Sequence, residues 1–158
     1  MIFSFQQMKQ EEAKEIADNW KYSGQYSFYD TTADEEDYRE FTDPVKRGNG
    51  YFSCYVDNKL AAYYSVNIVE ESKAEVGLGL KPGLTGKGYG LNFVNNVMAH
   101  ISSRHSVTVF MLSVASFNQR AIKVYKKAGF KEAEIFTQNT NGGSYEFLRM
   151  VKCAIPPC

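Results

Sequence analysis

The sequence has few of the features that define disulfide-rich, metal-binding or membrane proteins. Its three cysteines are odd in number and lack metal-ligand spacing with the two histidines, which argues against a disulfide framework and a zinc site. The mostly apolar stretch at residues 107–112 is far shorter than the roughly 20 residues that span a bilayer. No charged-then-apolar leader opens the chain. We therefore expect a cytoplasmic protein without a membrane or a metal partner.

The chain also lacks an excess of charge of either sign. Eighteen Lys and Arg balance eighteen Asp and Glu, so no global positive field favours nucleic acid through counterion release. The charges are nevertheless unevenly distributed. Residues 1–60 carry seven basic and twelve acidic side chains, whereas residues 61–158 carry eleven and six. This division would suit a site where a polyanionic ligand meets one half of the chain and a cationic ligand meets the other.

The length of 158 residues fits one domain, residues 1–153, followed by a tail at 154–158 whose prolines disfavour regular structure. Apolar periodicity and turn signals predict the secondary structure. We expect strands at residues 2–7, 51–56, 60–69, 74–80, 107–114, 130–138 and 145–152, and helices at residues 10–20, 34–41, 88–104 and 118–128. This order indicates an α/β (α+β) fold with a mixed sheet.

A glycine-rich segment at residues 78–90 links an expected strand to an expected helix. Glycines let a ligand approach the backbone, and the unpaired N–H groups at a helix start favour phosphate. A Walker loop is excluded, because Lys87 is followed by Gly88 rather than by Ser or Thr. A dinucleotide fingerprint is excluded too, because the spacing is Gly86-x-Gly88-x-Gly90 and no acidic residue lies at 107–115.

A second motif lies in the expected helix at residues 118–128. The segment has the pattern Asn-x-x-Ala-x-x-x-Tyr-x-x-x-Gly-Phe, beginning at Asn118 and including Tyr125. Seven residues separate Asn118 from Tyr125, so both project from the same helix face. Together, this motif, the glycine loop and the order of elements resemble the GNAT superfamily of acyl-CoA-dependent N-acetyltransferases. The resemblance covers nearly the whole chain and is strongest from residue 76 to residue 130.

The resemblance implies a GNAT-like mixed, mostly antiparallel seven-stranded sheet, with a parallel central pair splayed for CoA and about four flanking helices. It implies acetyl-CoA as cofactor and CoA as product. The pantetheine arm would pair with the main chain of Leu78 and Leu80, in the gap between residues 74–80 and 107–114. The full set of residues expected to bind the cofactor is Leu78, Leu80, Thr85, Gly86, Lys87, Gly88, Tyr89, Gly90, Asn118 and Lys127.

Two of these positions leave alternatives open. Thr85 stands where the family usually has Arg or Gln, so one side-chain contact to the pyrophosphate is expected to be missing. Asn118 either orders the cofactor or only caps the helix start.

The resemblance also implies catalytic roles. Tyr125 matches the superfamily's usual general acid, which protonates the departing thiolate; a Tyr that only packs on the cofactor is the alternative. The general base is open. Ser113 matches the position where ribosomal-protein N-terminal acetyltransferases of this superfamily often place Glu, and serine is not a strong base. Glu75, a relay water on Ser113, and Asp30 are the candidates.

The acceptor pocket is expected between the first two helices, where superfamily members vary. The predicted acceptor-binding residues are Tyr22, Tyr26, Phe28, Tyr29 and Asp30. Rings beside carboxylates suit an amine on an apolar stem; the alternative is that the rings fill core.

The expected function is transfer of acetyl to a primary amine of a small molecule or peptide, by direct attack in a ternary complex. We expect a monomer or homodimer. The alternative function is a non-catalytic module that binds CoA or acyl-CoA.

Overall fold

A computed structural model describes residues 2–155. Its seven strands form one sheet in the order β1-β2-β3-β4-β5-β7-β6. Only β4 and β5 pair in parallel; the other neighbours are antiparallel. The predicted mixed sheet with a central parallel pair is confirmed. The strands are β1 (Ser4–Gln7), β2 (Tyr51–Val56), β3 (Lys59–Val69), β4 (Lys73–Leu80), β5 (Val109–Ala115), β6 (Lys131–Thr140) and β7 (Gly143–Cys153).

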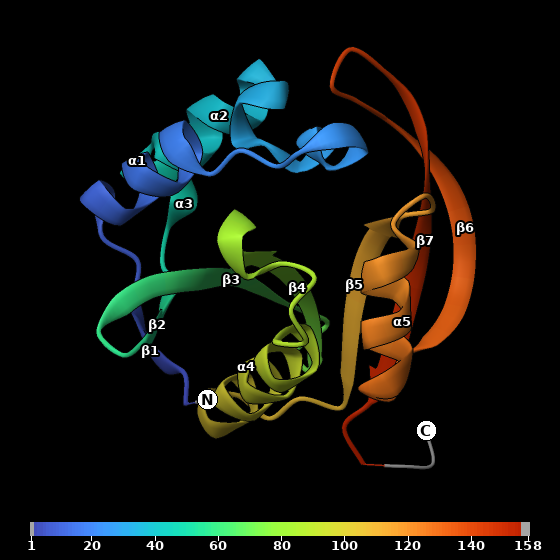
Figure 1. The fold of residues 1–158 in the computed structure, drawn as a ribbon. Helices are drawn as coiled ribbons and strands as arrows, with labels where there is room; N and C mark the ends of the chain where they lie inside the picture. The colour runs from blue at the N-terminus through green and yellow to red at the C-terminus, as the bar shows by residue number, and fades with distance from the viewer. Residues whose placement is uncertain (1, 156–158) are drawn as a thin grey trace.

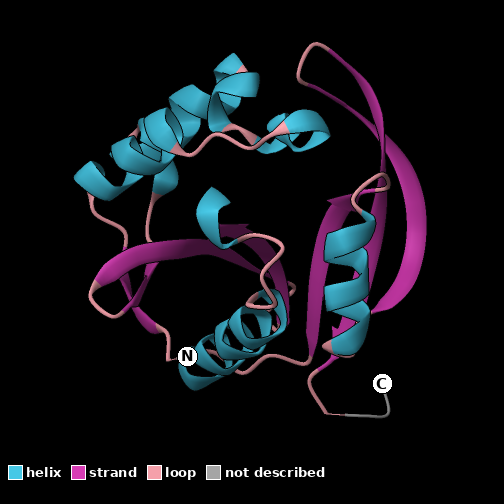
Figure 2. Cartoon of the chain, viewed as in Figure 1, coloured by secondary structure: helices cyan, strands magenta, loops and turns pink. Residues whose placement is uncertain are grey.

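Helices cover both faces of this sheet (Figure 1, Figure 2). The α-helices are α1 (Gln10–Asn19), α2 (Glu35–Thr42), α3 (Pro44–Arg47), α4 (Gly90–Arg104) and α5 (Gln119–Lys127). Three short 3-10 helices accompany them: η1 (Gly24–Tyr29), η2 (Thr31–Ala33) and η3 (Pro82–Leu84). The four predicted α-helices are confirmed, with shifts of one or two residues at their ends.

The sequence analysis missed α3. This helix has only four residues, which is too short to show an apolar period. Its local signals are clear in retrospect. The Asp43 carboxylate accepts a hydrogen bond from the Val45 amide (2.9 Å), and Pro44 occupies the first turn. The segment between the first two predicted helices, for which no element was predicted, likewise contains η1.

Two apolar clusters lie on opposite faces of the sheet. Tyr64 and Phe52 pack with α4, whereas Tyr63 and Tyr51 pack beneath α1 and α2. Neighbouring residues of one strand point to opposite faces, so each of β2 and β3 contributes to both clusters. The α1–α2 cluster ends at β3, which leaves this face of the sheet open over β4 and β5.

The cysteine analysis needs one correction. Cys54 is a buried free thiol, as expected, but Cys153 is disulfide-bonded, which the odd cysteine count did not predict. Within residues 2–155, no helix is long and apolar enough to cross a membrane. The same residues contain no group of three or more His, Cys, Asp or Glu side chains able to hold a metal ion.

Candidate active site

The two central parallel strands separate partway along their length. The register between β4 and β5 ends at Glu75 and Met111, although β4 continues to Leu80 and β5 to Ala115. The ribbons of the two strands diverge in Figure 1. β4 stays paired with β3 on its other edge through Leu80. The structure therefore has a V-shaped opening in the middle of the sheet, whose facing edges pair with no strand among residues 2–155 beyond its apex at Glu75 and Met111.

The backbone of β4 presents hydrogen-bonding groups to this opening. The Lys81 amide donates to the Ala61 carbonyl (2.9 Å), which directs residue 81 towards β3. Backbone groups alternate in direction along a strand, so those of Leu78 and Leu80 point the other way, into the V. This is the edge geometry that accepts an added extended chain. The predicted pantetheine contacts at Leu78 and Leu80 are placed where they can form, and they stay predictions.

The glycine loop follows β4 and leads into α4. Gly86 and Gly88 have φ values of 72° and 82°, a left-handed conformation that side chains disfavour. Tyr89 stands at the N-cap position but makes no side-chain cap hydrogen bond. The first amides of α4 therefore lack the usual cap, and they can serve an anion.

The space around the loop fits a phosphate ligand. A Cβ atom added at Gly88 would meet nothing within 4 Å, so this side of the loop is open. At Gly90, an added Cβ would lie 3.3 Å from Val124, so α5 packs closely against the helix start. Thr85 donates its hydroxyl to the Pro82 carbonyl oxygen (2.8 Å) and therefore stabilises the turn. The expected absence of a side-chain contact between Thr85 and the pyrophosphate stays a prediction.

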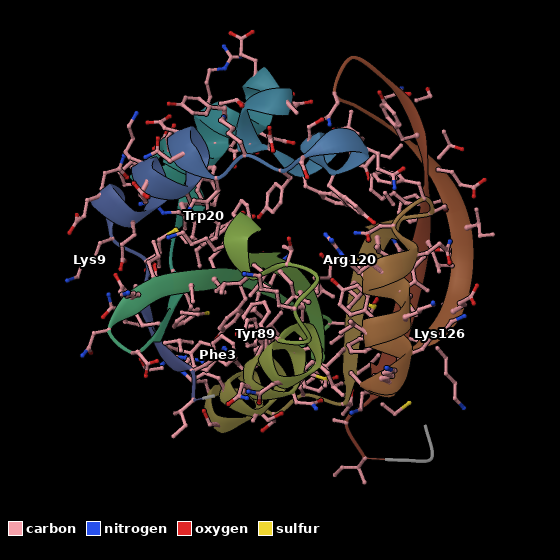
Figure 3. All side chains as sticks on the ribbon, in the orientation of Figure 1. Phe3, Lys9, Trp20, Tyr89, Arg120 and Lys126 are labelled. Carbon is pink, nitrogen blue, oxygen red and sulfur yellow. The ribbon has the colours of Figure 1, made fainter. Side chains whose placement is uncertain are left out.

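A guanidinium from α5 lies beside this loop. The Arg120 Nη1 atom is 3.4 Å from the position that a Cβ on Gly86 would take, and its Cζ lies 4.2 Å from the Tyr26 ring centroid. Figure 3 shows Arg120 extending from α5 towards the centre of the molecule, whereas Lys126 lies on the outer side. Lys126 forms an ion pair with Glu132 (2.7 Å). Lys127 is seven residues from Arg120 and shares its helix face, and its predicted contact with CoA stays a prediction.

Asn118 and Tyr125 are both carried by the α5 segment. The Asn118 side chain accepts a hydrogen bond from the Ala121 amide (3.1 Å), which confirms its role as helix cap. Its amide nitrogen donates to the Tyr29 hydroxyl (3.2 Å). A direct contact between Asn118 and the cofactor stays a prediction.

Tyr125 packs its ring edge-on against Phe130, at 6.0 Å between centroids. Burial raises the pKa of its phenol, and Tyr29 nearby raises it further. The phenol is therefore protonated at neutral pH, as a proton donor must be. No hydrogen bond is made by its hydroxyl within the described part of the chain.

The aromatic segment between α1 and α2 lies at the open end of the V. The Tyr22 hydroxyl donates to the Leu80 carbonyl oxygen (2.7 Å) at the end of β4. The Ala115 amide, at the end of β5, donates to the Tyr29 hydroxyl (3.2 Å). Burial raises the pKa values of both phenols. The two tyrosines thus fasten this segment to both arms of the V.

The other predicted acceptor residues also support the segment. Phe28 packs on Tyr145 at 4.8 Å between ring centroids. The Asp30 carboxylate accepts from the Tyr22 amide (2.8 Å), so it holds the segment's own backbone. The acceptor-binding roles predicted for residues 22–30 stay predictions.

A cavity of about 610 Å³ lies at the apex of the V. Glu75 and Ser113 line it from the two strands, together with Val76, Gly77 and Leu112, which follow the last strand pair. Two of the three candidates for proton removal from the amine therefore share one cavity, although they are far apart in sequence, whereas Asp30 does not line it. The aromatic residues 22–30 do not line this cavity.

Sequence reasoning missed the cationic residues of this cavity. Lys46 and Arg47 reach it from α3, and Arg149 reaches it from β7. The close approach of α3 depends on Gly50, where an added Cβ would lie 2.6 Å from the Val66 carbonyl oxygen. No local motif marks these residues, because their meeting depends on how α3 and β7 pack against the sheet.

Comparisons with known proteins agree with this geometry. The acetyltransferase (GNAT) family matches residues 12–130. No curated protein matches the sequence. The aminoglycoside acetyltransferase AAC(6')-Ib in complex with coenzyme A has a similar structure, with a TM-score of 0.73, 16% identity, and coverage of 97% of this chain and 95% of that one.

Two further structures illustrate the range of similar proteins. A spermidine N-acetyltransferase SpeG chimera from Vibrio cholerae and hSSAT has a TM-score of 0.72, 16% identity, and coverage of 96% and 95%. The ribosomal-protein-S18-alanine N-acetyltransferase from Escherichia coli has a TM-score of 0.69, 17% identity, and coverage of 99% and 97%. At these identities the structural likeness shows the fold alone. The family match spans most of the chain, and we conclude that this protein belongs to the acetyltransferase (GNAT) family.

Proposed function

We propose that this protein is an acetyl-CoA-dependent N-acetyltransferase that acetylates a primary amine by direct attack in a ternary complex. One observation carries the proposal: pairing of β4 with β5 stops at Glu75 and Met111, and the unpaired end of β4 leads into a glycine loop that opens a helix. An extended acyl carrier with a diphosphate group fits that combination of free strand edge and free amides.

Acetyl-CoA supplies an activated acetyl group on a thioester. The free edge at Leu78 and Leu80 orients the carrier arm, and the amides from Gly86 to Gly90 bind its diphosphate. A β4 amide that faces the V is placed to donate to the thioester oxygen as negative charge develops there. Loss of one such donor typically costs about 2.7–4 kcal/mol of barrier.

We assign the proton transfers to side chains on β4, β5 and α5. An incoming amine loses a proton to Glu75, directly or through a water held by Ser113, and its nitrogen forms the new C–N bond. The C–S bond breaks, and Tyr125 donates a hydrogen bond and then its proton to the departing sulfur. The raised pKa of Tyr125 keeps its phenol protonated at neutral pH, so its hydroxyl is available to donate to the sulfur.

Release of free thiol from acetyl-CoA, measured against a panel of amines, tests the proposal. We expect amine-dependent release, and a fall of about 100-fold in kcat for Tyr125→Phe with little change in the KM for acetyl-CoA. Tyr38→Phe is the matched control, because Tyr38 lies on α2 and bonds Asp18 at 2.6 Å, away from the V. Equal turnover of Tyr125→Phe and Tyr38→Phe would show that Tyr125 is not the general acid.

The same assay separates the alternative function, a non-catalytic module. The hydroxyl of Thr85 is engaged with Pro82, so the loop lacks one side-chain contact to the diphosphate, which favours that alternative. A rise in melting temperature with CoA, without thiol release for any amine, would establish the module and overturn the enzyme.

A further inference from the structure

Arg47 is a buried cation without a carboxylate partner. Its side chain is 7% exposed. It donates to the Phe41 carbonyl oxygen (2.6 Å) and to Gln10 Oε1 (2.9 Å), both neutral acceptors. Within residues 2–155, no carboxylate oxygen lies within 4.0 Å of its guanidinium. A guanidinium has five N–H donors, so most of the donor capacity of Arg47 is unused.

This arrangement points to an anion that is not part of the chain. A buried unpaired charge is unfavourable, and a neutral amide side chain could make the same two hydrogen bonds without that penalty. Arg47 lines the cavity at the apex of the V, and no nitrogen of its side chain is both sealed from solvent and unbonded. Nη1 and Nη2 each make one of the two hydrogen bonds, so the unbonded Nε is the donor shown to keep access to solvent, in a residue that lines the cavity.

The other charges around the cavity indicate what that ligand carries. Lys46 is exposed and forms no ion pair within the described residues, whereas Arg149 is paired with Glu134 at 2.8 Å. Glu75 is the acidic residue that lines the cavity. The unpaired charges are thus two cations from α3 and one carboxylate from β4, so a ligand with both an amine and an anionic group would meet complementary charge.

We propose that the acceptor is a small amine that also carries a carboxylate, as an amino acid or a short peptide does. This inference rests on the proposed function. The amine lies towards Glu75 and Ser113, where it loses its proton, and the carboxylate binds Arg47 and Lys46. The cavity volume of about 610 Å³ is in the range of small-molecule sites. An acceptor with several positive charges and no anion is disfavoured, because two unpaired cations line the cavity.

Matched pairs of amines with and without the carboxylate test this proposal. Ornithine with putrescine, and lysine with cadaverine, differ by one carboxylate each. We expect kcat/KM for the carboxylate member to be about tenfold higher or more, the scale of a hydrogen bond to a charged group. Arg47→Gln retains donors for Phe41 and Gln10 but removes the charge, so it should lower that ratio towards one by raising the KM of the carboxylate member.

Arg39→Gln is the control variant. Arg39 lies on α2 and its side chain is 70% exposed, at 4.0 Å from Glu35, so this substitution should leave the ratio unchanged. Equal or better turnover of the decarboxylated amines would overturn the carboxylate site and leave the acetyltransferase function intact.

A binding measurement makes the test independent of turnover. In the presence of CoA, Nα-acetyl-lysine should raise the melting temperature more than N-acetylcadaverine, and Arg47→Gln should abolish the difference. If the two compounds shift the melting temperature differently but no amine releases thiol, the carboxylate site is supported and the proposed reaction is overturned. If neither a carboxylate-dependent shift nor any turnover occurs, both proposals are overturned.

Discussion

Two buried charged side chains, Glu12 on α1 and Arg47 on α3, stand in opposite situations. Glu12 is 5% exposed and Arg47 is 7% exposed. The Glu12 carboxylate accepts hydrogen bonds from the Lys9 amide (2.8 Å), the Gln6 side chain (2.9 Å), Ser53 (2.9 Å) and the Tyr55 hydroxyl. Among the residues that the structure describes, Arg47 bonds two neutral acceptors and no carboxylate, and it lines a cavity.

The difference shows how a buried charge that stabilises the fold can be distinguished from one that is available to bind a ligand. The acceptor sites of Glu12 are filled by its own chain, and its donors come from β1, β2 and the start of α1, so it joins these elements together. The donors of Arg47 are mostly unused, and the residue lines a cavity that Glu75 and Ser113 also line. Burial alone does not distinguish the two residues, whereas the completeness of their hydrogen bonding does.

The largest expected effect is on the hydrogen-bond network around Glu12. Glu12→Ala leaves several buried donors without an acceptor, so we expect the free energy of unfolding to fall by about 3 kcal/mol. Urea denaturation followed by circular dichroism measures this. Glu11→Ala, an exposed neighbour on the same helix, should change it by less than about 0.5 kcal/mol. A small effect of Glu12→Ala would mean that the network does not join α1 to the sheet.

Gly50→Ala tests the packing that brings Arg47 to its cavity. The new Cβ would lie 2.6 Å from the Val66 carbonyl oxygen, a backbone atom that cannot rotate away. We expect a loss of about 2 kcal/mol in unfolding free energy, with a raised KM for the carboxylate-bearing acceptor. Gly83→Ala, where an added Cβ meets nothing within 4 Å, is the matched control for stability. Equal stability of the two variants would contradict this account of α3.

Acid should weaken the hydrogen-bond network around Glu12. Burial acts to raise the pKa of Glu12, but its hydrogen bonds with Tyr55, Lys9, Ser53 and Gln6 together hold the pKa below the usual value of 4.5. A lowered folded-state pKa stabilises the fold above about pH 4.5, and this contribution is lost as pH falls below that value. Denaturation midpoints between pH 7 and pH 3 should fall more steeply for the wild type than for Glu12→Gln. Parallel curves would refute the linkage.

The smallest expected stability effect is at Arg47. Because Arg47 has no ion-pair partner, replacing it with an apolar side chain of similar length removes an unfavourable buried charge along with two hydrogen bonds. We expect Arg47→Met to change the unfolding free energy by less than about 1 kcal/mol in either direction. If Arg47→Met lowers the unfolding free energy as much as Glu12→Ala does in the same assay, Arg47 stabilises the fold and does not differ from Glu12 in this respect.

The parts of the site that could be predicted from sequence are those encoded locally. Gly86 and Gly88 adopt the left-handed backbone that their residue type favours, and Asn118 caps α5, one of the two roles that its place at the start of the helix left open. The strand ranges of β2 and β3 followed from local sequence patterns, whereas the central parallel pair was implied by the resemblance to the GNAT superfamily.

The cavity could not be predicted, because tertiary packing brings its residues together. Arg47 comes from a four-residue helix without a period, and it reaches the cavity only because Gly50 allows a close backbone contact with β3. The aromatic residues 22–29 were recognised as a group, but their hydrogen bonds to Leu80 and Ala115 join segments about 60 and 90 residues apart, which no local pattern encodes.

Amide hydrogen exchange with and without CoA is the most direct test of the V-shaped opening as the cofactor site. We expect CoA to slow exchange at Leu78, Leu80 and residues 86–90, while β6, at the edge of the sheet beyond β7, exchanges at the same rate in both samples. Unchanged exchange at residues 78–90, or slowing confined to another part of the chain, would contradict the account.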